Sequence, residues 1–168
     1  MKILETERLY LREITADDAQ RAYDLNLDPE VIRYTGDVAF LNVEEARKFL
    51  VTYDHYKIYG FGRWAVIDKN TNEFLGWCGL KFTPALDEYD IGFRFFKKHW
   101  NKGFATEAAR ACIDLGFKKF GMKVIVGRAM PDNKASIRVL TKIGLNFLEE
   151  RITDGETEFI YQILNPDL

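Results

Sequence analysis

The sequence has no long hydrophobic run, few cysteines and prolines, and no excess of charge of either sign. Only two of its 168 residues are cysteines and four are prolines. No stretch reaches the roughly 18 apolar residues that a membrane-spanning helix requires. The formal net charge is -2, so no overall field attracts nucleic acid. We therefore expect neither membrane insertion nor nucleic-acid binding.

The two cysteines, Cys78 and Cys112, stand in apolar surroundings far apart in the sequence. This placement favours buried thiols in a reducing compartment over a disulfide or a metal site. No group of cysteine, histidine and acidic residues has ligand spacing, so we expect no metal. The segment from Met1 to Arg8 is charged and lacks the apolar core of a signal peptide. These features predict a cytoplasmic protein, and they leave a homodimer open.

The hydrophobic periodicity predicts one domain over residues 1–168, because no repeat, linker or low-complexity tract divides the chain. Strands are expected over residues 9–14, 63–67, 74–82, 88–96, 124–126, 147–152 and 157–164. Helices are expected over residues 19–27, 42–53, 104–120 and 133–143, with a short helical turn at 31–32. The expected fold class is α/β (α+β). An antiparallel meander is followed by two βαβ crossovers and a C-terminal hairpin around Asp154-Gly155.

The most informative segment leaves a strand at Phe96, passes through lysines and Gly103, and enters a helix at Phe104. A helix N-terminus carries unpaired N–H groups and a partial positive charge, so it binds anions. Gly103 allows close approach of backbone and ligand. The segment matches neither GxxxxGK[ST] nor GxGxxG, which argues against nucleoside triphosphates and dinucleotides. It predicts a diphosphate site, with an ordinary loop as the alternative.

A second segment follows about thirty residues later and begins a helix at Asn133. Asn133 and Ser136 lie one helical turn apart, and Ser136, Leu140 and Ile143 share one helix face. Asn133 can cap the helix and offer an amide to a ligand. The alternative is a capped amphipathic helix without a ligand.

Together the two segments closely resemble the coenzyme-A-binding motif of the GNAT superfamily of acetyltransferases. The branch they resemble contains ribosomal-protein N-terminal acetyltransferases. Its Trp-Gly-Lys-Gly-Tyr-Ala-Thr-Glu-Ala motif matches Trp100 to Ala108 except at Asn101 and Phe104. Thr6 to Arg12 and Asp90 to Phe93 also resemble family strands. The sequence departs from the wider superfamily in two places.

The first departure is Trp100, where the wider superfamily has Gln or Arg. The second is Leu140, where many members place a tyrosine acid. A tyrosine general acid is therefore not carried over.

The resemblance implies that acetyl-coenzyme A is the co-substrate and that a bound amine attacks its thioester directly. It assigns coenzyme A binding to Phe93, Phe95, Lys98, Asn101, Lys102, Gly103, Phe104, Ala105, Thr106, Asn133 and Ser136. Asp90 is the favoured proton acceptor, through water, and Glu88 is the alternative; both could instead be solvated residues at a strand end. Ser136 either protonates the departing thiolate or only bonds to the cofactor. His99 is expected to be a partly exposed loop residue near phosphate.

Three classes of acceptor amine are compatible with the sequence. Branch resemblance favours a protein N-terminal α-amine, and a polyamine or an amino-acid-like or drug amine stay open. A cationic acceptor would suit the acidic residues of the segment from 28 to 61, namely Asp28, Glu30, Asp37, Glu44 and Glu45. A non-catalytic acyl-coenzyme A sensor is the alternative from another functional class.

The motif order predicts selective binding of coenzyme A. At a hundredfold excess over its dissociation constant, coenzyme A should raise the free energy of unfolding by about 2.7 kcal/mol, because it binds the native state. NAD and ATP should do much less. Thermal unfolding with each ligand measures the difference, and equal stabilisation by NAD would contradict the prediction.

Overall fold

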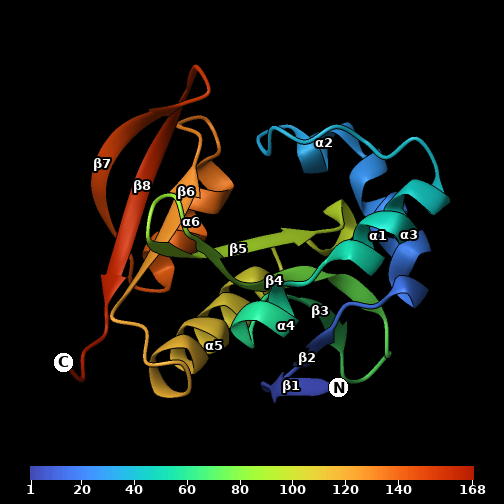
Figure 1. Cartoon of the computed structure of the whole chain (residues 1–168), viewed down its shortest axis with the longest axis horizontal. Helices are drawn as coiled ribbons and strands as arrows, with labels where there is room; N and C mark the ends of the chain where they lie inside the picture. Colours follow the sequence, from blue (N-terminus) through green and yellow to red (C-terminus); the bar gives the residue numbers. More distant parts are fainter.

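The computed structural model describes all 168 residues as one eight-stranded sheet with six helices (Figure 1). The strands are β1 (Lys2–Glu5), β2 (Leu9–Glu13), β3 (Arg63–Asp68), β4 (Phe74–Thr83), β5 (Glu88–Phe95), β6 (Val124–Ala129), β7 (Asn146–Thr153) and β8 (Glu156–Leu164). The helices are α1 (Ala19–Leu27), α2 (Pro29–Ile32), α3 (Val43–Thr52), α4 (His55–Tyr59), α5 (Phe104–Lys118) and α6 (Lys134–Lys142). Every predicted element is present, and the mixed α/β fold is confirmed. Strand β1 and helix α4 were not predicted.

The sheet order is β1-β2-β3-β4-β5-β6-β8-β7. Strands β2 to β5 form the predicted antiparallel meander. The crossover through α5 makes β5 and β6 the parallel pair of the sheet, and they share one register position, Asp90 with Val126. Beyond it the strands diverge, and β6 and β8 lean steeply away from β5 in Figure 1.

The second crossover differs from the expected arrangement. Strand β7 runs parallel to β6 but does not pair with it, because β8 lies between them and is antiparallel to both. The reason is visible in the burial of the two strands. Strand β8 carries the buried residues Ile160 and Tyr161, whereas β7 is almost entirely exposed. The more apolar strand therefore takes the inner position, and the more polar strand forms the sheet edge.

Helix α5 covers one face of the sheet and carries an apolar stripe that includes Ala108, Ala109, Cys112 and Ile113. Small residues on this stripe let the helix approach closely. A Cβ atom at Gly116, for example, would lie 2.9 Å from Ile125 Cδ1. Cys78 and Cys112 are buried free thiols, as predicted, and their Sγ atoms are 3.8 Å apart across the β4–α5 contact. This packing fixes where the N-terminus of α5 lies.

Helices α1, α2 and α3 lie on the opposite side of the sheet from α5 (Figure 1). Asn42 caps α3 by accepting the N–H of Glu45 at 2.9 Å, as the sequence predicted. None of the helices combines the length and apolar character needed to cross a bilayer.

Candidate active site

A cavity of 470 Å³ lies at the divergence of β5 from β6. Its walls come from the end of β5, the loop and first turn of α5, α6, and the chain around α2. Nine of the predicted coenzyme A residues line it: Phe93, Phe95, Asn101, Gly103, Phe104, Ala105, Thr106, Asn133 and Ser136. The fold thus brings the two sequence segments to one cavity.

The α5 N-terminus has the geometry of an anion site. Gly103 precedes the helix with a φ of 79°, in the left-handed region that favours glycine. The amide groups of Phe104, Ala105 and Thr106 belong to the first helical turn, where they have no intrahelical acceptor, and no side chain caps them. These residues line the cavity, and their N–H groups can donate hydrogen bonds to phosphate oxygens. The residues present therefore fit the diphosphate of coenzyme A.

Arg8, immediately before β2, holds this helix end in place. Its Nε donates to Glu107 Oε2 at 2.7 Å, and its Nη1 donates to the carbonyl of Lys102 at 2.8 Å. The guanidinium lies 4.4 Å from the ring centroid of Phe104. Glu107 Oε1 also accepts the Thr6 hydroxyl at 2.6 Å and the Arg8 N–H at 2.9 Å. We call Thr6, Arg8 and Glu107 the N-terminal clamp.

The N-terminal clamp neutralises a negative charge at the α5 N-terminus. Glu107 lies in the first turn of α5, where an unpaired carboxylate would oppose a bound diphosphate. Burial acts to raise the pKa of Glu107, but the hydrogen bonds from Thr6 and Arg8 outweigh burial, and the net pKa is lowered. The carboxylate is therefore ionised but paired with Arg8. Thr6 and Arg8 belong to the segment that resembles a family strand, but no role was predicted for them from the sequence.

Two neighbouring aromatic groups shape the loop before α5. The indole Nε1 of Trp100 donates to the carbonyl of Phe95 at 2.9 Å, which ties the loop to the end of β5. His99 is buried, not partly exposed as expected, and it lines the cavity. Burial lowers the pKa of His99 despite the nearby Glu73 carboxylate. The imidazole is consequently neutral at pH 7 and adds no positive charge to the anion site at the α5 N-terminus.

The lysines predicted to bind coenzyme A lie outside the cavity lining. Lys98 forms an ion pair with Glu73, and Lys102 contributes its carbonyl to Arg8. On α6, Asn133 Oδ1 accepts the N–H of Ser136 at 3.2 Å, so Asn133 caps the helix as predicted. The Ser136 hydroxyl lines the cavity and has no hydrogen bond within the chain.

The two predicted carboxylates differ in their surroundings. Asp90 is buried at the closed end of the β5–β6 divergence, and its Oδ1 accepts from the Arg63 guanidinium. Its Oδ2 has no hydrogen bond within the chain. Glu88 uses both oxygens, because Arg151 binds Oε1 at 3.0 Å and Arg128 and Arg151 both bind Oε2. Neither carboxylate lines the cavity, and their catalytic roles stay predictions.

Several further residues line the cavity, and of these only Glu30 was singled out in the sequence, as part of the acidic segment. Glu30, Arg33, Tyr34 and Thr35 reach the cavity from α2 and the chain after it, about sixty residues before the α5 loop, and Arg94 reaches it from β5. Only the folded arrangement places these residues there.

The N-terminal clamp predicts that Arg8→Met weakens coenzyme A binding about tenfold, because it leaves the Glu107 carboxylate unpaired beside the diphosphate. Calorimetric titration with coenzyme A measures the change. The double variant Arg8→Met with Glu107→Gln is the control, since it removes the unpaired charge and should recover part of the affinity. A double variant that binds no better than Arg8→Met would show that the clamp acts only through structure.

Comparison with known proteins agrees with this geometry. Residues 8–146 match the family model described as "Acetyltransferase (GNAT) domain". The chain is 33% identical over 145 residues to "Uncharacterized N-acetyltransferase p20" of Bacillus licheniformis, which covers 85% of this chain and 82% of that one. A GNAT-family acetyltransferase from Bacillus anthracis superposes with a TM-score of 0.83 at 29% identity, covering 98% of this chain and 99% of the other.

A ribosomal-protein-S5-alanine acetyltransferase from Vibrio fischeri has the same fold, with a TM-score of 0.83 at 19% identity over 99% of this chain and 98% of that one. The family match covers most of the chain and includes the loop, helix and strand that build the cavity. The protein belongs to the GNAT family and is an acetyl-coenzyme A-dependent N-acetyltransferase.

Proposed function

We propose that this N-acetyltransferase acetylates the α-amino group at the N-terminus of a protein or peptide. The observation that supports this acceptor over a polyamine is the pairing of carboxylates on the acceptor side. Glu30 pairs with Lys97, Asp37 with Arg94, and Asp90 with Arg63. The likeness to the ribosomal-protein acetyltransferase branch, noted in the sequence, points the same way.

The other acidic residues named for this region are also engaged. Asp28 and Glu45 accept backbone N–H groups, and Glu44 lies 3.5 Å from Arg47. A polyamine needs several uncompensated carboxylates to offset the desolvation of its charges. In the acidic segment that suggested a cationic acceptor, three carboxylates are therefore already paired with cationic side chains. A single α-amine beside neutral peptide groups requires much less compensation.

The mechanism uses direct attack of the amine, for which acetyl-coenzyme A supplies the thioester carbonyl. The first turn of α5 holds the phosphates. Past Asp90 the edge of β5 toward β6 has no strand partner, so backbone N–H groups near Phe93 and Phe95 can polarise a carbonyl oxygen. The Ser136 hydroxyl, which has no hydrogen bond within the chain, relays a proton to the leaving sulfur. It gives up its own proton and takes the one that the acylated nitrogen loses, so it ends as a neutral hydroxyl.

Asp90 accepts the amine proton through water in this proposal. Its Oδ2 has no hydrogen bond within the chain, whereas both oxygens of Glu88 are held by arginines. A carboxylate with one oxygen fixed and one available is both oriented and able to accept a proton. This difference favours Asp90 over Glu88 as the base.

Asp90→Asn should lower kcat/KM by about 10²–10⁴ near pH 7, the usual contribution of general base catalysis. The loss should shrink above the pKa of the amine, because the free amine then needs no base. Steady-state rates from pH 6 to 10 measure this, with coenzyme A affinity as the check that the cofactor site is intact. Glu88→Gln is the matched control and should change the shape of the pH profile little. Near-normal rates for Asp90→Asn at pH 7 would contradict the role.

The acceptor class is tested by mass spectrometry with acetyl-coenzyme A and three amines. These are a peptide with a free N-terminus, the same peptide with a blocked N-terminus and an internal lysine, and spermidine. We expect the acetyl group on the free N-terminus alone. Faster acetylation of spermidine or of the internal lysine would overturn the proposed acceptor.

A further inference from the structure

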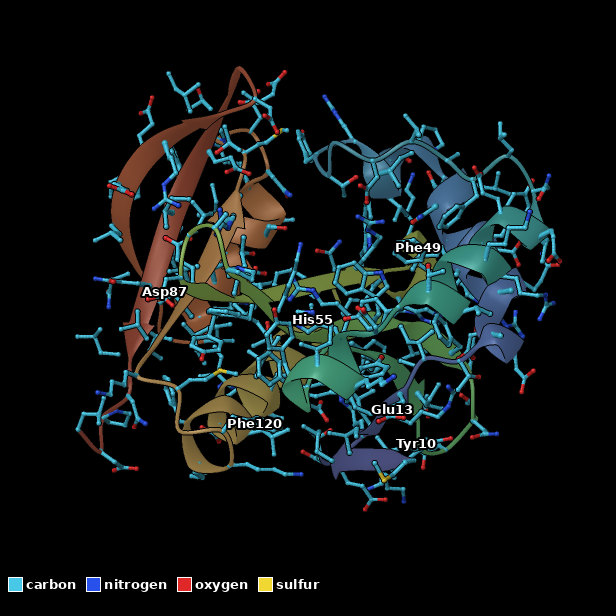
Figure 2. The ribbon with its side chains drawn as sticks, in the orientation of Figure 1. Tyr10, Glu13, Phe49, His55, Asp87 and Phe120 are labelled. Atoms are coloured by element: carbon cyan, nitrogen blue, oxygen red, sulfur yellow. The ribbon has the colours of Figure 1, made fainter.

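A second cavity, of 310 Å³, lies between the sheet and helices α1 and α3, on the face opposite α5. Its walls are mostly apolar and include Leu25, Phe40, Phe49, Leu50, Phe74 and Trp77. Figure 2 labels Phe49 among the side chains on this side of the sheet. We call this cavity the apolar pocket. Its size and lining suit one large apolar side chain.

Arg94 connects the apolar pocket with the coenzyme A cavity, because it is the one residue that lines both. Its Nη1 donates to Asn26 Oδ1 at 2.8 Å and its Nη2 donates to Asp37 Oδ2 at 2.7 Å. Its side chain is only 10% exposed, yet its Nε is buried without a hydrogen-bond acceptor. A buried unpaired donor is costly, so the site favours a ligand that brings an oxygen to Arg94.

The charges around the apolar pocket select against a cationic group. Arg63 and Arg94 lie beside the Trp77 ring, 5.5 Å and 5.2 Å from its centroid. Arg63 forms an ion pair with Asp90. Asp37, the acidic residue of the pocket wall, forms an ion pair with Arg94. A lysine or polyamine chain would enter a pocket whose carboxylate is already paired. An apolar group carries no charge, so its burial in the pocket requires no carboxylate partner.

We propose that the apolar pocket holds the side chain of the residue that carries the acceptor amine, and that the carbonyl or carboxylate oxygen next to this amine accepts a hydrogen bond from Arg94 Nε. The inference rests on the proposed function and narrows it. The acceptor is an α-amine on a large apolar residue, such as phenylalanine or leucine. A peptide N-terminus and a free amino acid both offer this combination of α-amine, adjacent oxygen and apolar side chain.

The test compares kcat/KM for amidated tripeptides that begin with Phe, Leu, Ser or Lys and continue with two alanines. Free phenylalanine is included to separate a peptide acceptor from an amino acid. Peptides that begin with Phe or Leu should react at least about tenfold faster than those with Ser or Lys, because their side chains become buried. Equal rates for all four peptides would overturn the inference and leave the N-terminal acceptor intact. If spermidine alone were acetylated in the acceptor test described above, both this inference and the N-terminal acceptor would be wrong.

Ala22→Phe provides the structural test, because Ala22 lines the apolar pocket from α1 and the larger side chain would fill it. It should reduce kcat/KM about tenfold or more for the Phe peptide and leave the Ser peptide within twofold. The matched control is Ala85→Phe, an exposed residue in the β4–β5 turn outside both cavities. It should match the wild type on all peptides.

Calorimetric titration of the coenzyme A complex with phenylalanine amide gives a readout without turnover. Binding to the wild type that is lost in Ala22→Phe supports the pocket. No binding to the wild type, or equal binding to both proteins, would refute it.

Arg94→Lys tests the hydrogen bond separately, because lysine keeps the charge but loses the Nε–H donor. We expect KM for the Phe peptide to rise about tenfold while coenzyme A affinity stays within twofold. An unchanged KM would remove Arg94 from acceptor recognition.

Discussion

Strands β5 and β6 share one register position, Asp90 with Val126, and diverge beyond it. This separation is the constraint on which the site depends. It leaves one edge of β5 without a strand partner, and the N-terminus of α5 reaches the cavity that opens there. Because α5 packs through small residues against the sheet, its first turn is held rigidly at that opening. Arg8 adds a second attachment from the far end of the meander.

Features that depend on short sequence patterns were predictable. Alternation and helical periodicity located every strand of the meander and the long helices, and Gly103 before Phe104 marked the start of α5. The short β1 and α4 lack enough residues to show a period. The insertion of β8 between β6 and β7 depends on which hairpin strand is more buried, a tertiary property that local spacing does not encode.

The ionic partners were not predictable, because they join residues far apart in the chain. Asp90 and Arg63 are 27 positions apart, and Arg8 and Glu107 are 99 positions apart. Asp90 was therefore favoured over Glu88 only through the family resemblance, and Lys98 was expected to bind coenzyme A. The fold distinguishes the first two by their arginine partners and pairs the third with Glu73. For the same reason, the acidic composition of residues 28–61 does not reveal which of its carboxylates are paired.

The central claim is that coenzyme A lies across the first turn of α5 and along the open edge of β5. Amide hydrogen exchange measured with and without coenzyme A tests it most directly. The account predicts strong slowing of exchange at Phe104, Ala105 and Thr106 and along Phe93 to Phe95, with little change at Phe49 and Leu50 of the apolar pocket. Unchanged exchange at the α5 N-terminus in the presence of saturating coenzyme A would contradict it.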